Sequence, residues 1–246
     1  MNAPQHAPHY PNPPDSFIFD RAVAPIFPSM AERSIPNYHA AHALHAAIAL
    51  DGFLDHGSKV LDIGASRAGF VKHLKTQIER AHSLEIPRNL QITATDISPD
   101  MCSHMAADFP DIEVVQEDIR SQEFFGREEK YDVVNCSYVI QFVPPDEQVR
   151  VLRKVASLVK KGGVLFLGQK EQSPGVAGNL LHNSYIQFRL ANGYSREEIR
   201  RKTEALANSM WPINYESMLS ELRHQGFSEV VGTTRAGVFS TVMCVR

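Results

Sequence analysis

Short runs rich in β-branched and other apolar residues recur along the middle of the chain, each separated from the next by a helix-compatible stretch or a loop. Such runs predict strands, and strands that alternate with helices predict a parallel sheet. Apolar residues fill the runs almost continuously, which is typical of strands covered by helices on both faces. The five runs are KVLDIGA (59–65), QITATDI (91–97), IEVVQED (112–118), YDVVNCSYVI (131–140) and GVLFLGQ (163–169).

Two further patterns complete the expected sheet. The segment after Pro145 predicts a helix, which residues 160–162 close. Its apolar residues recur at helical spacing: Val149, Leu152, Val155, Leu158 and Val159. SEVVGTTRAG (228–237) and VFSTVMCVR (238–246) predict two antiparallel strands joined by a short turn. We therefore expect a single α/β domain with a Rossmann-like, seven-stranded sheet that is mostly parallel and has an antiparallel last strand.

The remaining segments predict additions to this sheet. Residues 1–15 contain five prolines and almost no aliphatic side chains, so we expect a disordered tail. Residues 16–57 predict a helical arm, and residues 58–246 predict the sheet domain with a helical insertion at about 171–226. Within the insertion, Ser195 and Glu198 form a capping-box pattern that begins a helix at Arg196. The arm and the insertion are both candidate lids.

Composition narrows the class of function. The chain has 246 residues, of which 43% are hydrophobic, and its net charge of -3 gives no strong field for nucleic acid. No apolar run reaches the roughly 18 residues that a membrane span needs. Cys102, Cys136 and Cys244 have neither disulfide-framework nor zinc-site spacing, which favours a reducing compartment. We expect a cytoplasmic homodimer that acts on a small molecule.

Three histidines have a spacing that could ligate a metal ion. His39, His42 and His45 recur every third residue in an alanine-rich, helix-favouring segment. No acidic or cysteine partner accompanies them in the sequence. We therefore expect surface histidines and no metal site.

The first predicted strand leads into a helix through DIGASRAG (62–69). Small residues at this point let the chain turn sharply and let its backbone approach a ligand closely. The two glycines are five positions apart, which does not match the GxGxxG fingerprint of dinucleotide-binding proteins. A tight turn that binds no ligand is the alternative interpretation.

Three acidic residues stand at the carboxyl ends of the first three predicted strands: Asp62, Asp96 and Asp118. Ligands bind at this edge of open α/β sheets. Asp96 is suited to accept from two ribose hydroxyls, and Asp118 with Ile119 to bind the amino group and the face of adenine. Each acid alone is more often a helix N-cap or a solvated loop residue. Together they predict a site for an adenosine without phosphates.

At these positions the chain resembles the class I S-adenosylmethionine-dependent methyltransferases, through VLDIGASRAGF, ATDIS, EDI, YDVVNCSYVIQF and LRKVASLVKKGGVLFLGQK. Within that superfamily it is most similar to the carboxy-S-adenosylmethionine synthases, and this similarity extends over residues 17–246. Those enzymes convert S-adenosylmethionine and prephenate to carboxy-S-adenosylmethionine. The resemblance implies that the cofactor contacts Tyr38, Gly64, Ala65, Ser66, Asp96, Ile97, Asp118, Ile119 and Asn135; to these we add Asp62.

One position departs from the family pattern. The family has an arginine, which pairs with the added carboxylate of the cofactor, where this chain has Thr203. A threonine hydroxyl donates one neutral hydrogen bond and cannot form a charged fork. Arg200 lies one helical turn earlier and is a candidate replacement for the missing arginine.

Other side chains of the insertion have two interpretations. The rings either shield a sulfonium by cation–π contact or belong to the core; they are Tyr185, Phe188, Tyr194 and Trp211. The basic run at 196–202 is interpreted as a solvated helix face, with a tRNA contact as the alternative.

Because a sulfonium is already an activated leaving group, the enzyme needs to bury the cofactor, align a nucleophile and exclude water. Our first interpretation is a transferase that moves the methyl group to a small acceptor. The alternatives are carboxy-S-adenosylmethionine synthesis, as the resemblance implies; cyclisation or lysis of the cofactor, which releases methylthioadenosine and by amine attack gives azetidine-2-carboxylate; and cofactor binding without catalysis. The candidate catalytic residues are Asn135, Tyr138, Tyr185 and Thr203.

Overall fold

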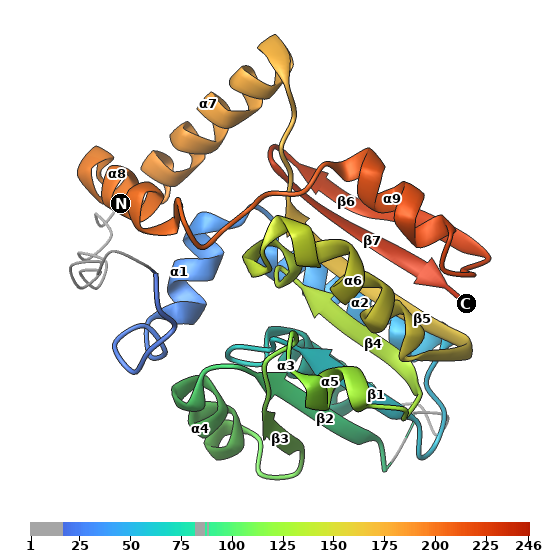
Figure 1. The fold of residues 1–246 in the computed structure, drawn as a ribbon. Helices are drawn as coiled ribbons and strands as arrows, with labels where there is room; N and C mark the ends of the chain where they lie inside the picture. Colours follow the sequence, from blue (N-terminus) through green and yellow to red (C-terminus); the bar gives the residue numbers. More distant parts are fainter. Residues whose placement is uncertain (1–16, 82–86, 88) are drawn as a thin grey trace.

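The sheet of the computed structural model has seven strands in the order β3-β2-β1-β4-β5-β7-β6 (Figure 1). The structure describes residues 17–81, 87 and 89–246, so the predicted disordered tail lies outside the described residues. Strands β1 to β5 pair in parallel, and β7 runs antiparallel to both β5 and β6. This confirms the predicted mixed sheet. The strands are β1 Lys59–Ile63, β2 Gln91–Asp96, β3 Glu113–Gln116, β4 Tyr131–Ser137, β5 Val159–Lys170, β6 Glu229–Ala236 and β7 Phe239–Val245.

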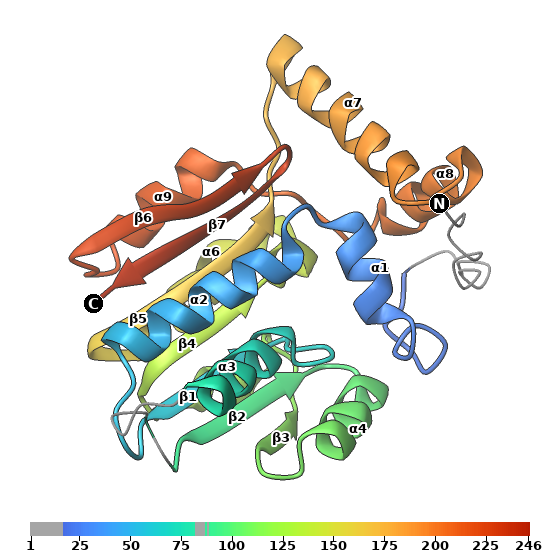
Figure 2. The ribbon, with the colours of Figure 1, turned by 180° about the vertical axis from the view of Figure 1, so that it is seen from behind.

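Helices cover both faces of the sheet, as its continuously apolar strands predict. One face packs against α2 Tyr38–Gly52, α3 Gly69–Arg80 and α4 Pro99–Asp108, the side seen in Figure 2. The other face packs against α5 Gln122–Gly126, α6 Pro145–Ser157 and α9 Tyr215–Arg223, the side seen in Figure 1. Each large apolar side chain buried in these layers contributes about 1.5 to 3 kcal/mol. The resulting rigid sheet fixes the positions of the strand ends.

The boundary between α6 and β5 differs from the prediction. The helix ends at Ser157, whereas the spacing of Leu158 and Val159 predicts a helix that continues through both residues. The carbonyl of Leu158 instead accepts from the backbone N–H of Tyr131 at 2.9 Å, and Val159 pairs with Tyr131 in the sheet. Strand pairing with β4 therefore outweighs the helical spacing of two residues, and β5 begins earlier than expected.

Three helices stand beyond the carboxyl edge of the sheet (Figures 1 and 2). They are α1 Phe27–Ser34 from the arm and α7 Gly175–Ala191 and α8 Arg196–Leu206 from the insertion. The capping box at the start of α8 is present: Glu198 N donates to Ser195 Oγ at 3.1 Å, and Ser195 N donates to the Glu198 carboxylate at 2.7 Å. The third helix of the predicted insertion, α9, packs against α6 and β6 and so joins the sheet layer. The helices that cover the carboxyl edge are therefore α1, α7 and α8.

No helix in the described part of the chain is long and apolar enough to cross a membrane.

Candidate active site

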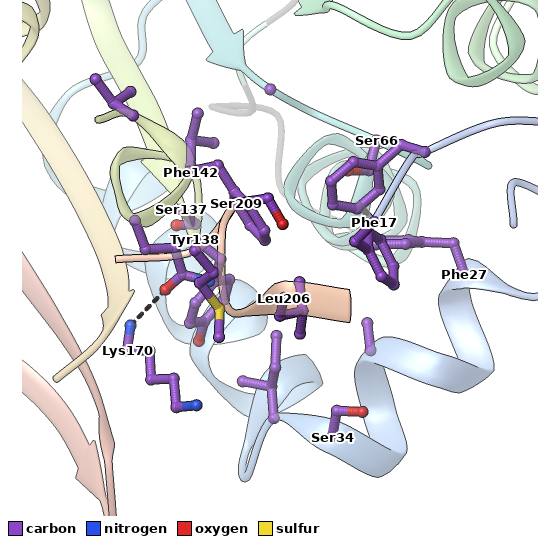
Figure 3. Close-up of a pocket in the computed structure, with 18 of the residues that line it drawn as sticks. Phe17, Phe27, Ser34, Ser66, Ser137, Tyr138, Phe142, Lys170, Leu206 and Ser209 are labelled. Atoms are coloured by element: carbon purple, nitrogen blue, oxygen red, sulfur yellow. Dashed lines mark hydrogen bonds between the residues drawn. The ribbon is translucent and has the colours of Figure 1, made fainter. Parts of the chain in front are cut away.

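A cavity of about 530 Å³ lies at the carboxyl edge of the sheet, between the strand ends and the helices α1, α7 and α8. Figure 3 shows Tyr138 and Lys170 on one side of it and Phe17, Phe27 and Ser34 of the arm on the other. The residues predicted to contact the cofactor and the candidate catalytic residues all line this cavity: Tyr38, Asp62, Gly64, Ala65, Ser66, Asp96, Ile97, Asp118, Ile119, Asn135, Tyr138, Tyr185 and Thr203. The fold therefore brings side chains from distant parts of the chain to one place.

The turn between β1 and α3 brings bare backbone to the cavity wall. Gly64, Ser66 and Ala68 all have left-handed backbone, with φ of 59°, 52° and 54°. A Cβ on Gly64 would lie 2.5 Å from Cγ2 of Val139, so only glycine fits there. The N–H of Ser66 donates to Oδ2 of Asp96 at 2.8 Å and ties the turn to the end of β2. The strained turn predicted from DIGASRAG is thus a fixed part of the wall.

Asp62 at the end of β1 is a buried carboxylate. Its Oδ1 accepts from Nδ2 of Asn135 at 2.7 Å, while its Oδ2 is buried without a hydrogen-bond partner. Burial raises the pKa of the Asp62 carboxyl to about 7. Oδ1 of Asn135 in turn accepts from Ser137 Oγ at 2.7 Å, which fixes the amide orientation. A backbone N–H of Val71 also stabilises the charged form of Asp62, and the carboxylate keeps part of its acceptor capacity for a ligand.

Asp96 and Asp118 have different surroundings. Asp96 accepts from the N–H groups of Ser66 and Ser98, at 2.8 and 2.9 Å, and each of its oxygens keeps a second lone pair. Asp118 forms an ion pair with Arg120 at 2.9 Å, a partner that the sequence interpretation missed. Ile97 beside them is 53% exposed, so it forms an apolar rim to the cavity. An adenine amino group at Asp118 would share the carboxylate with Arg120.

Aromatic rings form the middle of the cavity. Tyr138 has a left-handed backbone with φ of 66°, and its ring lies 5.8 Å from that of Tyr38 and 6.1 Å from that of Phe239. Tyr185 packs edge-on against Phe239 at 5.5 Å. Of the other rings named from the sequence, Trp211 lines the cavity, whereas Phe188 and Tyr194 do not.

Two of the three histidines of α2 differ from the expectation of surface side chains, whereas His39 is exposed as expected. His42 and His45 are 4% and 1% exposed, because the small alanines around them let α2 pack closely. His45 stacks on Phe166 at 4.5 Å and hydrogen-bonds Thr233 at 2.9 Å. Burial lowers the pKa of both imidazoles to about 3, so both are neutral at pH 7. Within the described residues, no group of three or more histidine, cysteine or acidic side chains is arranged to hold a metal ion.

Three cationic side chains line the part of the cavity next to α7 and α8: Arg189, which is buried, and Lys170 and Lys202, which are partly buried. None of them was nominated from the sequence. Lys170 is the last residue of β5. A search of the predicted strand ends for basic as well as acidic residues would have found it. Arg189 and Lys202 carry no such signal, because their convergence depends on how α7 packs against α8.

Arg200 does not reach this cavity. Its guanidinium is exposed and pairs with Glu197 and Glu204, both at 2.7 Å, beside a separate hollow between α7 and α8. Thr203 does line the cavity, and its hydroxyl donates to the carbonyl of Ile199 at 2.7 Å. The position of the family arginine therefore carries no charge, and the proposed replacement points elsewhere.

Comparison with known proteins places these observations in a family. Residues 61–165 match the model of a methyltransferase domain. The chain is 32% identical over 224 residues to the carboxy-S-adenosyl-L-methionine synthase of Cronobacter sakazakii, an alignment that covers 86% of this chain and 83% of that protein. It is also 32% identical over 221 residues to the enzyme of the same name from Shewanella amazonensis, with 87% and 86% covered.

A solved structure shares the fold. The magnesium protoporphyrin IX methyltransferase of Synechocystis, solved with bound SAH, aligns with a TM-score of 0.56 at 15% identity and covers 85% of this chain and 83% of that one. The sheet order, the strand-end acids and the identity over most of both chains agree. The chain therefore belongs to the carboxy-S-adenosyl-L-methionine synthase family, enzymes that use S-adenosylmethionine and have the methyltransferase fold.

Proposed function

We propose that the protein synthesises carboxy-S-adenosylmethionine from S-adenosylmethionine and a small carboxylate, prephenate by resemblance to its family. One observation carries the proposal: a single cavity is lined by acidic and amide side chains where β1 to β4 end and by three cationic side chains from the end of β5, α7 and α8. The acidic and amide side chains suit a cofactor with an ammonium and a sulfonium, and the cationic side chains suit an anionic partner. Of the interpretations left open by the sequence, this reaction uses both sets of side chains.

The cofactor is proposed to lie along the ends of β1 to β4. Asp96 then accepts from the ribose hydroxyls, and Asp118 with Ile119 binds the adenine. The unpartnered Oδ2 of Asp62 fits the ammonium of the aminobutyryl chain, beside Asn135. This placement puts the sulfonium near Tyr138 and Tyr185, between the two sets of side chains.

The chemistry asks little of the protein beyond position. In prephenate the bond between the ring and its carboxyl group breaks and releases CO2, while the ring expels its hydroxyl group as hydroxide and becomes aromatic. Hydroxide takes one proton from the sulfonium methyl group as water, and the resulting carbanion forms the C–C bond to CO2. The products are carboxy-S-adenosylmethionine, phenylpyruvate and water. The residues of this chain hold the two reactants together and exclude water, which is how a positioned site accelerates a reaction between two molecules. Asn135 and Tyr138 hold the cofactor side, while Tyr185 and Thr203 border the partner.

A second candidate is an intramolecular reaction of the cofactor, and Asp62 and Thr203 favour it. In that reaction the amine attacks the γ-carbon, the C–S bond breaks and methylthioadenosine leaves. The amine must first lose a proton, and the raised pKa of Asp62, about 7, suits that carboxylate to accept it. The intramolecular reaction needs no second substrate. Thr203 favours it, because the position at which the family has an arginine carries no charge to bind a second carboxylate.

We also infer the assembly and location of the protein. The first part of the arm with α1, together with the helices α7 and α8, acts as a lid over the carboxyl edge of the sheet, whereas α2 packs on a sheet face. Val176 and Leu180 on α7 are 76% and 64% exposed, which supports a homodimer through this helix. Three free thiols fit a cytoplasmic protein with a small-molecule substrate and no nucleic acid partner.

Cofactor affinity is expected to fall as the pH drops below 7. The Asp62 carboxyl, with its pKa raised to about 7, is mostly protonated at pH 6, and the cofactor ammonium favours the ionised form. Binding must then expel a proton, so the affinity falls by up to about tenfold per pH unit below the pKa. Calorimetry between pH 6 and 8 measures this slope, and Asp62→Asn should flatten it. A slope that persists in Asp62→Asn assigns the titration to another group.

The product assay tests the proposed function. Purified protein is incubated with S-adenosylmethionine, with and without prephenate, and the products are identified by mass. Carboxy-S-adenosylmethionine formed only with prephenate is the expected result. Methylthioadenosine formed without prephenate establishes the intramolecular reaction, and a methylated acceptor with S-adenosylhomocysteine establishes methyl transfer.

A further inference from the structure

Cationic side chains gather where α1, α7, α8 and the end of β5 meet. The ring of Tyr194 lies 4.4 Å from the guanidinium of Arg33 and 5.5 Å from the ammonium of Lys202. The ring of Tyr185 lies 4.3 Å from the guanidinium of Arg189 and 5.0 Å from the ammonium of Lys170. Ser34 at the end of α1 connects to this group. Its hydroxyl accepts a hydrogen bond from Lys202 Nζ at 3.0 Å and forms another with the hydroxyl of Tyr194 at 3.0 Å.

These cations lack anionic partners. In the described part of the chain, no ion pair involves Lys170, Arg189 or Lys202. Nε of Arg189 is buried without any hydrogen-bond acceptor, although the residue is only 5% exposed. A buried cation without an anion is costly, and proteins keep such groups where a ligand supplies the missing charge. The rings of Tyr185 and Tyr194 contact these cations but do not supply the negative charge of an anion.

Lys170, Arg189 and Lys202 line the cavity in which the cofactor is proposed to bind. Arg189 comes from α7 and Lys202 from α8, and Thr203 lines the same cavity. Lys202 directly precedes the position at which the resembling family has its arginine. Arg200, the replacement nominated from the sequence, does not line this cavity; it lines a separate hollow with Arg189 and Thr203, and its guanidinium is already paired with Glu197 and Glu204.

We propose that Arg189 and Lys202 bind a carboxylate of the second substrate, in place of the arginine that the family has at position 203. The inference rests on the proposed function and names its anion-binding residues. The substrate class that fits is a small carboxylate whose apolar part lies against Tyr185 and Phe239. The other carboxylate that could occupy these two cations is that of the cofactor's own aminobutyryl chain.

The surroundings of Lys202 predict that anion binding takes up a proton. The charged and titratable groups that face it are Arg33 of α1, Lys170 of β5, Arg189 of α7 and the phenol of Tyr194. Burial and the neighbouring cations lower the pKa of Lys202 to about 7, so most of this amine is neutral at pH 8. An anion beside it favours the charged form, and the amine then gains a proton.

Calorimetry of prephenate, and of malonate as a simple dicarboxylate, added to protein saturated with S-adenosylhomocysteine tests the inference. We expect Lys202→Met and Arg189→Met to weaken anion binding by at least about tenfold. The control Arg200→Met removes an equal charge from the same region and should change it by less than about twofold. At pH 8, buffers of different ionisation enthalpy should report proton uptake in the wild type that Lys202→Met loses. Methionine replaces a buried charge by an apolar chain of similar length, so both variants should fold, and thermal unfolding checks this.

The outcomes separate this inference from the proposed function. Carboxy-S-adenosylmethionine formed from prephenate, with anion binding unchanged in both variants, overturns the inference and leaves the function standing. Malonate binding that depends on Lys202 and Arg189, without any product from prephenate, supports the inference and overturns the function. A loss of S-adenosylhomocysteine affinity equal to the loss of anion affinity assigns the cations to the cofactor carboxylate and overturns the inference. An absence of any anion binding to the wild type also overturns it.

Discussion

Asp96→Ala is expected to weaken S-adenosylmethionine binding by roughly ten- to a hundredfold. The side chain ends β2 at the cavity wall, and both of its oxygens keep a lone pair that faces away from the backbone N–H groups they accept from. Loss of a charged acceptor that makes two hydrogen bonds costs about 1.5 to 3 kcal/mol, which corresponds to this change in affinity. Calorimetry on the purified variant measures it.

Two further variants separate ligand contact from loop support. Asp96 also holds the N–H groups of Ser66 and Ser98, so alanine could loosen the turn as well as remove the ligand contact. Asp96→Asn keeps one oxygen acceptor and should lose less affinity than alanine. Asp55→Ala removes an exposed carboxylate elsewhere and should leave affinity unchanged. Binding within about threefold of wild type in a folded Asp96→Ala protein would place the ribose elsewhere.

Gly64→Ala is expected to destabilise the protein and to abolish measurable cofactor binding. The residue has a φ of 59°, and an added Cβ would lie 2.5 Å from Val139 Cγ2. Left-handed backbone costs a non-glycine residue about 1 to 2 kcal/mol, and overpacking adds about 1 to 3 kcal/mol. The thermal unfolding midpoint should therefore fall by about 5 to 15 °C. Relief of the clash would move the turn that borders the cofactor.

A mutant cycle divides this penalty into its two parts. In the Val139→Ala background, Gly64→Ala should lower the free energy of unfolding only by the cost of the left-handed backbone, because the clash with Val139 is gone. Gly52→Ala is the matched control, because a Cβ there meets no atom within 4 Å. A Gly64→Ala protein with wild-type stability and affinity would contradict the assignment of this turn to the cofactor site.

The sheet could be predicted from the sequence because each strand is specified locally. Apolar runs, glycine turns and strand-end acids lie close together along the chain, and parallel strands bring their ends to one edge. Two residues at the α6 boundary were assigned wrongly, since the pairing of Val159 with Tyr131 is a contact between distant segments. Sequence spacing carries no information on such pairing.

The cofactor end of the site was easier to nominate than the partner end. Asp62 and Asp96 follow their strands directly, whereas Arg189 and Lys202 lie on helices whose meeting depends on tertiary packing. Lys202 lay within a basic run interpreted as a solvated face, yet it points inward while Arg200 remains exposed. His42 and His45 show the same limit, because helix spacing does not tell which face a small-residue helix buries.

The most direct test of the account is a crystal structure of the protein with S-adenosylhomocysteine and prephenate. We expect the ribose hydroxyls on Asp96, the ammonium on Asp62 and a prephenate carboxylate within hydrogen-bond distance of Arg189 and Lys202. A nucleoside bound away from the ends of β1 to β4, or prephenate bound away from these two cations, would contradict it.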